Sequence, residues 1–298
     1  MNLSRTARIV LWAFMGFGLS FIYVPLMLVV INSFNKNKSF NWPPTGFTTM
    51  WWSKAASNPG VKDAILLSVL TATFATVIAL ILGSLAAAAI ARYKFFGRDV
   101  ISLIFVLPIA LPGIVTGIAL NNVFTNFFGG LTFFTIIIGH ATFCVVVVFN
   151  NVAARYRRMG SSFEEASMDL GANRITTFRL VTFPMIRNAL VAGGLLSFGL
   201  SFDEIIVTTF TAGAGQTTLP IWIFQNLFRP NQAPIVNVVA AAPAINLIAP
   251  ALLTPLPFVL IASGIVNAVA PLISKAAPLP IVVVEKPVTP GLELPKAS

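Results

Sequence analysis

Two of the nine acidic residues in this chain stand next to each other inside a long apolar stretch. A carboxylate within a membrane span is costly, and it usually faces the interior of a helix bundle or a water-filled path. Asp203 and Glu204 could therefore attract a cation along such a path, bind a neighbouring backbone as a structural pair, or hold a proton. Adjacent helical residues point about 100° apart, so we expect one of the two to line a path and the other to pack or cap.

A second acidic group lies in a polar segment between two apolar runs. Glu164, Glu165 and Asp169 occupy positions i, i+1 and i+5, which places them mainly on one side of a helix. Gly171 stands where a helix needs a left-handed residue at its end, and Asn173 can cap a new helix. The segment predicts a helix–turn–helix at the membrane surface, with Pro184 in the first turn of the next membrane helix. Six arginines surround it: Arg155, Arg157, Arg158, Arg174, Arg179 and Arg187.

Other reactive groups are sparse. His140 is the only histidine, and Cys144 is the only cysteine. Neither has the neighbours that a metal site or a disulfide requires, so we expect no metal and a hydrogen-bonded packing role for His140. The sequence contains no G-x-x-x-x-G-K-[ST] phosphate loop and no catalytic constellation on a soluble face. We expect no catalytic residue, no enzyme activity and no cofactor in this chain.

The composition is that of a membrane protein. Hydrophobic residues make up 57% of the chain, charged residues 9%, and the mean hydropathy is +0.88. A soluble domain carries about 25% charged residues. The net charge of +10 does not indicate nucleic-acid binding, because the cations cluster at the ends of apolar runs.

The apolar pattern predicts an all-α integral membrane protein with six transmembrane helices in one domain, residues 1–275. A Pro-rich tail, 276–298, is expected to be disordered. A kink is expected near Ile109, between Pro108 and Pro112. After about Ala242 further prolines interrupt the apolar pattern, so the last span is either kinked or altered. The predicted spans are 9–31, 64–91, 100–120, 131–150, 185–210 and 235–260, and the polar loop is 153–184.

The cations indicate the orientation. With the N-terminus inside, 14 of the 19 Lys and Arg residues fall in inner segments and 5 in outer ones. Cytoplasmic segments carry such an excess. The sequence therefore predicts a cytoplasmic N-terminus and a cytoplasmic polar loop.

The polar loop resembles the EAA loop of permeases in binding-protein-dependent ABC importers. That signature reads E-A-A, three residues, G, nine residues, I-x-L-P. This chain has Glu165-Ala166-Ser167, then Gly171, then Val181-Thr182-Phe183-Pro184 at the same spacing. Ser167, Val181 and Phe183 depart from the signature by small or apolar exchanges. The resemblance implies that a coupling helix docks into a cytoplasmic ATPase subunit through Glu164, Glu165, Ala166, Asp169 and Gly171.

Further motifs are similar to those of the second permease subunit of spermidine/putrescine importers. The similarity runs from about Ile9 to Ala242. The resemblance therefore implies a polyamine substrate, spermidine or putrescine. The alternative is iron, phosphonate or a sulfur oxyanion, because sister families that carry these substrates share the loop. The motifs are Asn32-Ser33-Phe34-Asn35, Gly46-Phe47-Thr48-Thr49, Arg92-Tyr93-Lys94-Phe95, 139–144 and Ser201-Phe202-Asp203-Glu204.

These resemblances imply a multi-pass permease subunit of the bacterial inner membrane. Its expected partners are a sister permease, an ATPase dimer that binds ATP and Mg, an outer substrate-binding protein and the lipid bilayer, with no nucleic acid. One rival is a secondary transporter that couples protons or sodium through Asp203 or Glu204, which predicts an inverted repeat that the sequence does not show. A membrane-embedded enzyme is the other rival, and it would need a reactive constellation.

Overall fold

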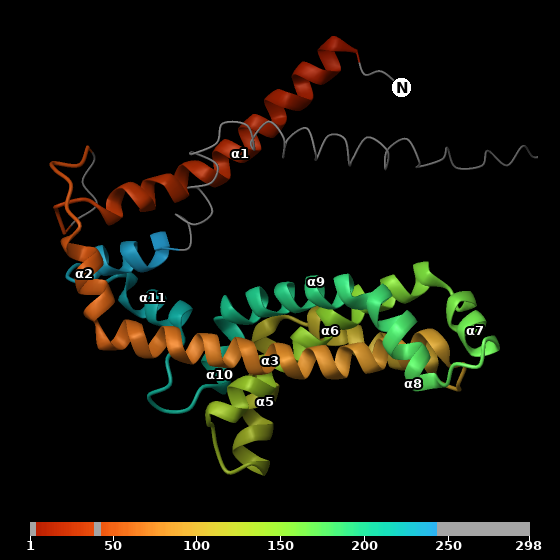
Figure 1. Ribbon diagram of the computed structural model, residues 1–298. Coiled ribbons are helices and arrows are strands. Elements are labelled where there is room, and N and C mark those ends of the chain that lie inside the picture. Colours follow the sequence, from red (N-terminus) through yellow and green to blue (C-terminus); the bar gives the residue numbers. More distant parts are fainter. Residues whose placement is uncertain (1–3, 39–42, 243–298) are drawn as a thin grey trace, which may run out of the picture. The chain divides into compact units, whose positions relative to one another are not determined.

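A computed structural model describes residues 4–38 and 43–242 of the chain (Figure 1). Residues 27–242 form one compact unit, and residues 4–26 belong to another. The described residues are predominantly helical and contain no β-strand, only an isolated bridge between Asn35 and Phe47. The predicted all-α class is confirmed for this part of the chain.

Four of the described helical segments are long and apolar enough to cross a membrane. They are α1 (Arg5–Ser33), α3 (Pro59–Arg92), α6 (Phe133–Met159) and the run Arg174–Phe202, whose larger part is α9 (Phe183–Phe202). α3 begins with Pro59 directly after Asn58, whose side-chain oxygen accepts a hydrogen bond from Val61 N at 3.2 Å. Proline is tolerated at this position because the first helical N–H groups have no partner within the helix.

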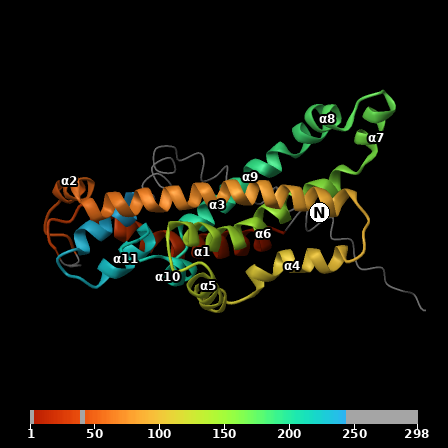
Figure 2. The same cartoon turned by 90° about the horizontal axis from the view of Figure 1, so that it is seen from below.

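The centre of the larger unit is the packing of α3, α6 and α9, which lie side by side in Figures 1 and 2. Small residues allow the close approach. A Cβ atom on Gly83 of α3 would lie 2.9 Å from Val145 O, and one on Gly193 of α9 would lie 3.3 Å from Val148 Cα. Short helices stand at both ends of this group. α7 (Ser162–Asp169) and α8 (Arg174–Thr177) lie at one end, and α2 (Met50–Ser57) and α11 (Leu219–Leu227) lie at the other.

Replacing Gly83 by alanine should lower the melting temperature of the purified protein. The added methyl group meets backbone atoms that cannot move aside, and overpacking of this kind costs about 1–3 kcal/mol. Gly199 of α9 is the matched control, since an added Cβ there meets nothing within 4 Å. Thermal unfolding in the same detergent compares the two variants. Equal melting temperatures would show that the α3–α6 contact is looser than described.

The predicted third span is two helices instead of one kinked helix. α4 (Arg98–Ala110) ends before Leu111, and α5 (Gly113–Phe127) begins after Pro112. Leu111 is extended, with ψ 143°, because the ring of the following proline disfavours the helical region for the residue before it. Figure 2 shows α4 and α5 as separate helices joined by a short link.

The predicted spans four and five also have other bounds. α6 continues past Asn150 through its polar last turns to Met159. It ends at Gly160, which has φ +68°. α9 stops at Phe202, and after a break at residues 203–205 the chain forms α10 (Ile206–Thr211). The prediction of one continuous span over 185–210 is therefore wrong, because the helix breaks at the acidic pair.

An apolar helix occupies Ala233–Ala242, where the predicted sixth span begins. The remainder of the expected span 235–260 and the expected tail 276–298 lie outside the described residues.

Candidate functional site

The polar loop forms the predicted helix–turn–helix. α7 (Ser162–Asp169) ends in a turn at Gly171, which has φ +87°, and α8 (Arg174–Thr177) follows. The side chain of Asn173 accepts a hydrogen bond from Thr176 N at 2.8 Å and so caps α8. Both local predictions, the left-handed glycine and the asparagine cap, agree with the structure.

The connection from α8 into the membrane helix differs from expectation. Pro184 lies in the first turn of α9, as predicted, but α8 runs without interruption through a π-helical turn, η1 (Phe178–Thr182), into α9. Proline lacks an N–H group and clashes with the preceding turn. A π turn before Pro184 widens the backbone there, which lets the helix pass the proline.

The three loop acids have different surroundings, although their spacing suggested one common side. Glu164 Oε2 lies 2.7 Å from Arg92 Nε at the end of α3, and both side chains are largely buried. Thr182 Oγ1 donates to Glu164 Oε1 at 2.7 Å. The Arg92 guanidinium also stacks over the ring of Tyr156 in α6, 5.0 Å from its centroid. Glu164 therefore ties α7 to α3 and η1.

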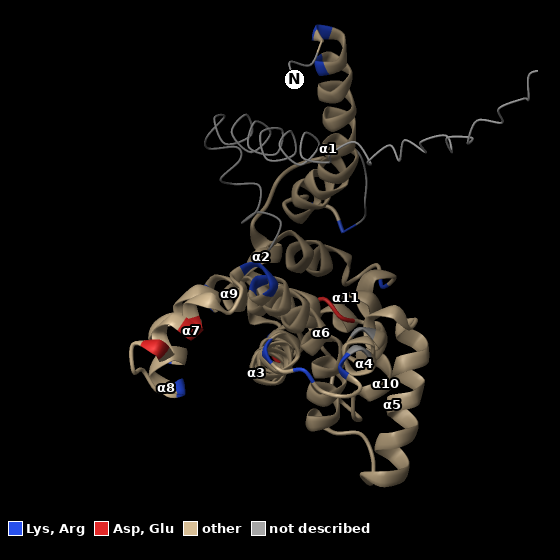
Figure 3. Cartoon of the chain, turned by 90° about the vertical axis from the view of Figure 1, so that its right-hand side faces the viewer, with Lys and Arg blue, Asp and Glu red and all other residues tan. Residues whose placement is uncertain are grey.

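Glu165, Ala166 and Asp169 are exposed on α7. Figure 3 shows the acidic segments of α7 next to the basic segment of α8. Among them the loop exposes large apolar side chains, with Leu170 91% and Ile175 79% accessible. Residues 163–178 therefore combine exposed acids with exposed apolar side chains, and we call them the coupling surface after the role that the sequence resemblance predicts. A cavity of about 390 Å³ lies beside it, between Arg92, Tyr156, Glu164 and Phe178.

At the break between α9 and α10 the two acids have separate roles. The Glu204 carboxylate accepts a hydrogen bond from Val207 N at 2.9 Å, so it caps α10. Asp203 is exposed, and only its backbone N–H is bound, to Gly199 O at 3.2 Å. Both acids stand outside the helices, so the 100° spacing of adjacent helical residues does not apply to them. The predicted path role of Asp203 stays a prediction.

α10 is held in place by polar contacts from other helices. Asn121 of α5 donates to Phe210 O at 2.6 Å, and Thr135 of α6 donates to Thr211 O at 2.7 Å. His140 of α6 lies between Ser201 and Thr208 at hydrogen-bond distance, as expected for a packing histidine. Among the described residues no group of three or more His, Cys, Asp or Glu could hold a metal ion. The sequence did not indicate this contact of Asn121, because its partner is a backbone carbonyl 89 residues away.

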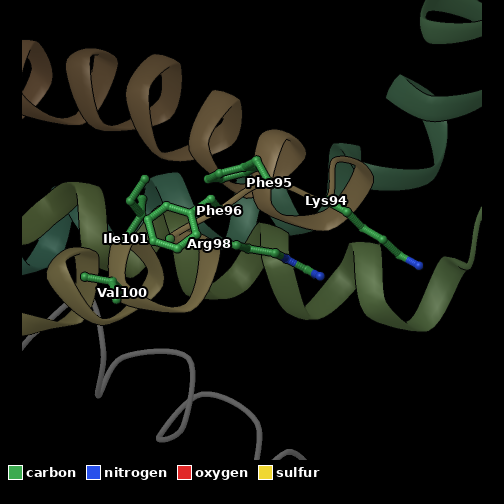
Figure 4. A pocket seen from close by; sticks show the side chains of 7 residues that line it. Lys94, Phe95, Phe96, Arg98, Val100 and Ile101 are labelled. Carbon is green, nitrogen blue, oxygen red and sulfur yellow. The ribbon is translucent and has the colours of Figure 1, made fainter.

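The short loop between α3 and α4 is aromatic and basic. Gly97, with φ +82°, turns the chain there. In Figure 4 the Lys94 and Arg98 side chains extend away from Phe96, Val100 and Ile101, and the residues of this loop line an open cavity of about 610 Å³. Phe96 is fully exposed. Aromatic and basic side chains at a helix end are typical of a membrane–water interface.

Residues 79–275 match the family described as binding-protein-dependent transport system inner membrane component. The match covers more than half of the chain. The chain therefore belongs to the family of inner membrane components of binding-protein-dependent transport systems, and the resemblance carried by the polar loop is confirmed.

Three named permease proteins are similar to this chain over most of its length. The putrescine transport system permease protein PotI of Escherichia coli (strain K12) is 33% identical over 231 residues, which cover 75% of this chain and 81% of the relative. The spermidine/putrescine transport system permease protein PotC of Haemophilus influenzae is 34% identical over 229 residues, which cover 76% of this chain and 88% of the relative. The sulfate transport system permease protein CysT of Salmonella typhimurium is 29% identical over 246 residues, which cover 76% of this chain and 86% of the relative.

A solved structure shares the fold. A chain from the crystal structure of a bacterial ABC transporter involved in the import of the acidic polysaccharide alginate aligns with a TM-score of 0.61 and 18% identity. The alignment covers 93% of this chain and 100% of that chain. It supports the ABC permease fold and carries no information about the substrate.

Proposed function

We propose that this chain is a permease subunit of an ATP-driven importer of polyamines such as putrescine and spermidine. The observation that carries the proposal is the exposed Asp203 at a helix break, in a chain that is 33–34% identical to permeases named for these substrates. A polycation that crosses a low-dielectric region needs negative charge nearby, since unit charges about 4 Å apart interact by ~4 kcal/mol at an effective dielectric of about 20.

The coupling surface is the proposed contact with the ATPase subunits. Glu165, Ala166 and Asp169 are accessible there, and Gly171 provides the turn that presents them. ATP and Mg bind to the ATPase dimer, because this sequence has no phosphate loop. A sister permease completes the path, and an outer binding protein delivers the substrate.

The contacts inside the chain suggest how ATPase movement reaches the path. Glu164 joins α7 to α3 through Arg92, and α8 continues through η1 into α9, which ends at Phe202, directly before Asp203. A displacement of the coupling surface therefore shifts both α3 and α9, the helix that leads to Asp203. Nucleotide-driven closure supplies the difference in affinity between inward- and outward-facing states that such a shift requires.

The proposed orientation predicts opposite labelling at the two ends of the bundle. In a background with Cys144→Ala, Lys54→Cys in α2 should react with a membrane-impermeant maleimide from the outer side. Ser162→Cys in α7 should react only after the inner membrane is opened. Both positions are exposed and lie at opposite ends of the helix group. The reverse pattern would place the coupling surface outside the cytoplasm and overturn the proposal.

Uptake measurements test the substrate. The chain and its partner subunits are expressed in cells that lack other polyamine importers, and uptake of labelled putrescine, spermidine and sulfate is compared. Polyamine uptake that stops when the ATPase subunit carries a defective phosphate loop supports the proposal. Sulfate uptake without polyamine uptake would place the chain with the sulfate permeases instead. Uptake that persists without a working ATPase would favour the secondary transporter.

A further inference from the structure

A fully buried histidine connects the two sides of the helix break that carries the acidic pair. His140 lies in α6 and is 0% exposed. Its Nδ1 atom is 2.7 Å from Ser201 Oγ in the last turn of α9, and its Nε2 atom is 2.8 Å from Thr208 Oγ1 in α10. Asp203 and Glu204 lie between these two hydroxyl residues in the sequence.

The hydrogen bonds around His140 fit one neutral tautomer of its ring. Thr208 Oγ1 donates to Glu204 O, at 2.8 Å. In this tautomer the same hydroxyl accepts a hydrogen bond from His140 Nε2–H. In a neutral imidazole the other nitrogen is an acceptor, so Ser201 donates to Nδ1. The neutral tautomer satisfies every group in this chain of contacts, which runs from α9 through α6 to the carbonyl of Glu204.

Few other contacts fix the backbone geometry of this break. It contains neither glycine nor proline, and three consecutive residues, Asp203 to Ile205, stand outside both helices. The Glu204 carboxylate fixes only the start of α10. Asn121 and Thr135 hold the far end of α10 through the carbonyls of Phe210 and Thr211. His140 is the described contact that holds the last turn of α9 and the start of α10 to one point.

We propose that His140 is a positioning residue for Asp203: it clamps α9 to α10 and so sets where the free carboxylate stands in the substrate path. This inference rests on the proposed function, in which Asp203 attracts an ammonium group of the substrate. Because its ring is fully buried, His140 acts on the substrate only through Asp203. A loss of the clamp leaves the carboxylate in several positions and weakens substrate binding without removing the charge.

Uptake kinetics of the assembled importer test this role. His140→Leu is expected to raise the KM for putrescine about tenfold, because a buried hydroxyl left without its partner shifts a local equilibrium by roughly that amount. His140→Gln keeps an amide that can reach one hydroxyl and is expected to restore part of the affinity. Cys144→Ala is the matched control: Cys144 is equally buried one turn further along α6, and its thiol makes only a 3.5 Å contact with Ser197 O. The KM of the Cys144→Ala variant should stay within about twofold of the value for the unmodified protein.

A double variant separates positioning from packing. If His140 acts through Asp203, His140→Leu should add no further change of KM in an Asp203→Asn background. A change of KM of the same size in both backgrounds would overturn the clamp while leaving the path role of Asp203 intact. An unchanged KM in Asp203→Asn itself would overturn both proposals together. If His140→Leu fails to assemble, Ser201→Ala and Thr208→Val each remove one end of the clamp and should raise the KM by smaller factors. Normal KM values in both of these variants would contradict the inference.

Discussion

Asp203→Asn is expected to reduce polyamine uptake by about tenfold to a hundredfold at low substrate concentration. The exchange keeps the size of the side chain and removes the only exposed charge at the α9–α10 break. An ammonium group about 4 Å away loses an attraction of ~4 kcal/mol at an effective dielectric of about 20, and its hydration recovers part of that loss. Initial rates of labelled putrescine uptake, normalised to the amount of assembled complex, measure the effect.

Glu204 provides the matched control for this prediction. Glu204→Gln keeps an oxygen that can accept from Val207 N, so the cap of α10 should survive and uptake should fall little. Glu204→Ala removes the cap and should cost about 1 kcal/mol of stability. A larger loss of uptake in Glu204→Gln than in Asp203→Asn would reverse the assignment of path and cap.

Breaking the contact between Arg92 and Glu164 should uncouple ATP hydrolysis from transport. Glu164→Ala leaves the Arg92 guanidinium buried without a partner carboxylate, which costs on the order of 3 kcal/mol when a buried pair loses one member. α7 then loses its tie to α3, while Glu165 and Asp169 stay available to the ATPase. We expect the ATPase to co-purify normally, and its hydrolysis to lose most of its response to the loaded binding protein.

Glu165→Ala is the control for the second prediction, because this neighbour on α7 is exposed and makes no described contact with α3. Glu165→Ala should weaken co-purification of the ATPase. In the complexes that remain, ATP hydrolysis should still be coupled to transport. Arg92→Ala should resemble Glu164→Ala, and the double variant should be no worse than either single variant. Normal substrate stimulation in Glu164→Ala would show that α3 does not take part in coupling.

The parts of the structure that the sequence predicted depend on local chemistry. Gly171 and Asn173 mark a turn and a cap that need only their immediate neighbours, and both were predicted correctly. Pro112 breaks the third predicted span through its effect on Leu111. Pro108 and Pro112 predicted a kink near Ile109 in one helix, and the structure instead has a break at Leu111.

The parts that were missed depend on distant residues. The break after Phe202 has no glycine or proline to signal it, and it is held by His140, Asn121 and Thr135, which are 60 or more residues away in the sequence. Glu164 and Glu165 are chemically equal neighbours, and only Arg92 at the end of α3 distinguishes them. A run of polar residues after Asn150 suggested a loop, yet a helix can continue past the membrane surface and α6 does so to Met159.

Reconstituted transport tests the central proposal most directly. The complex of this chain with its sister permease and ATPase subunits is placed in proteoliposomes, with the loaded binding protein on the outer side of the permeases and ATP on the ATPase side. The proposed function predicts accumulation of labelled putrescine or spermidine that requires ATP hydrolysis and falls sharply in Asp203→Asn. Accumulation of sulfate without polyamine, or polyamine movement that is independent of ATP, would contradict it.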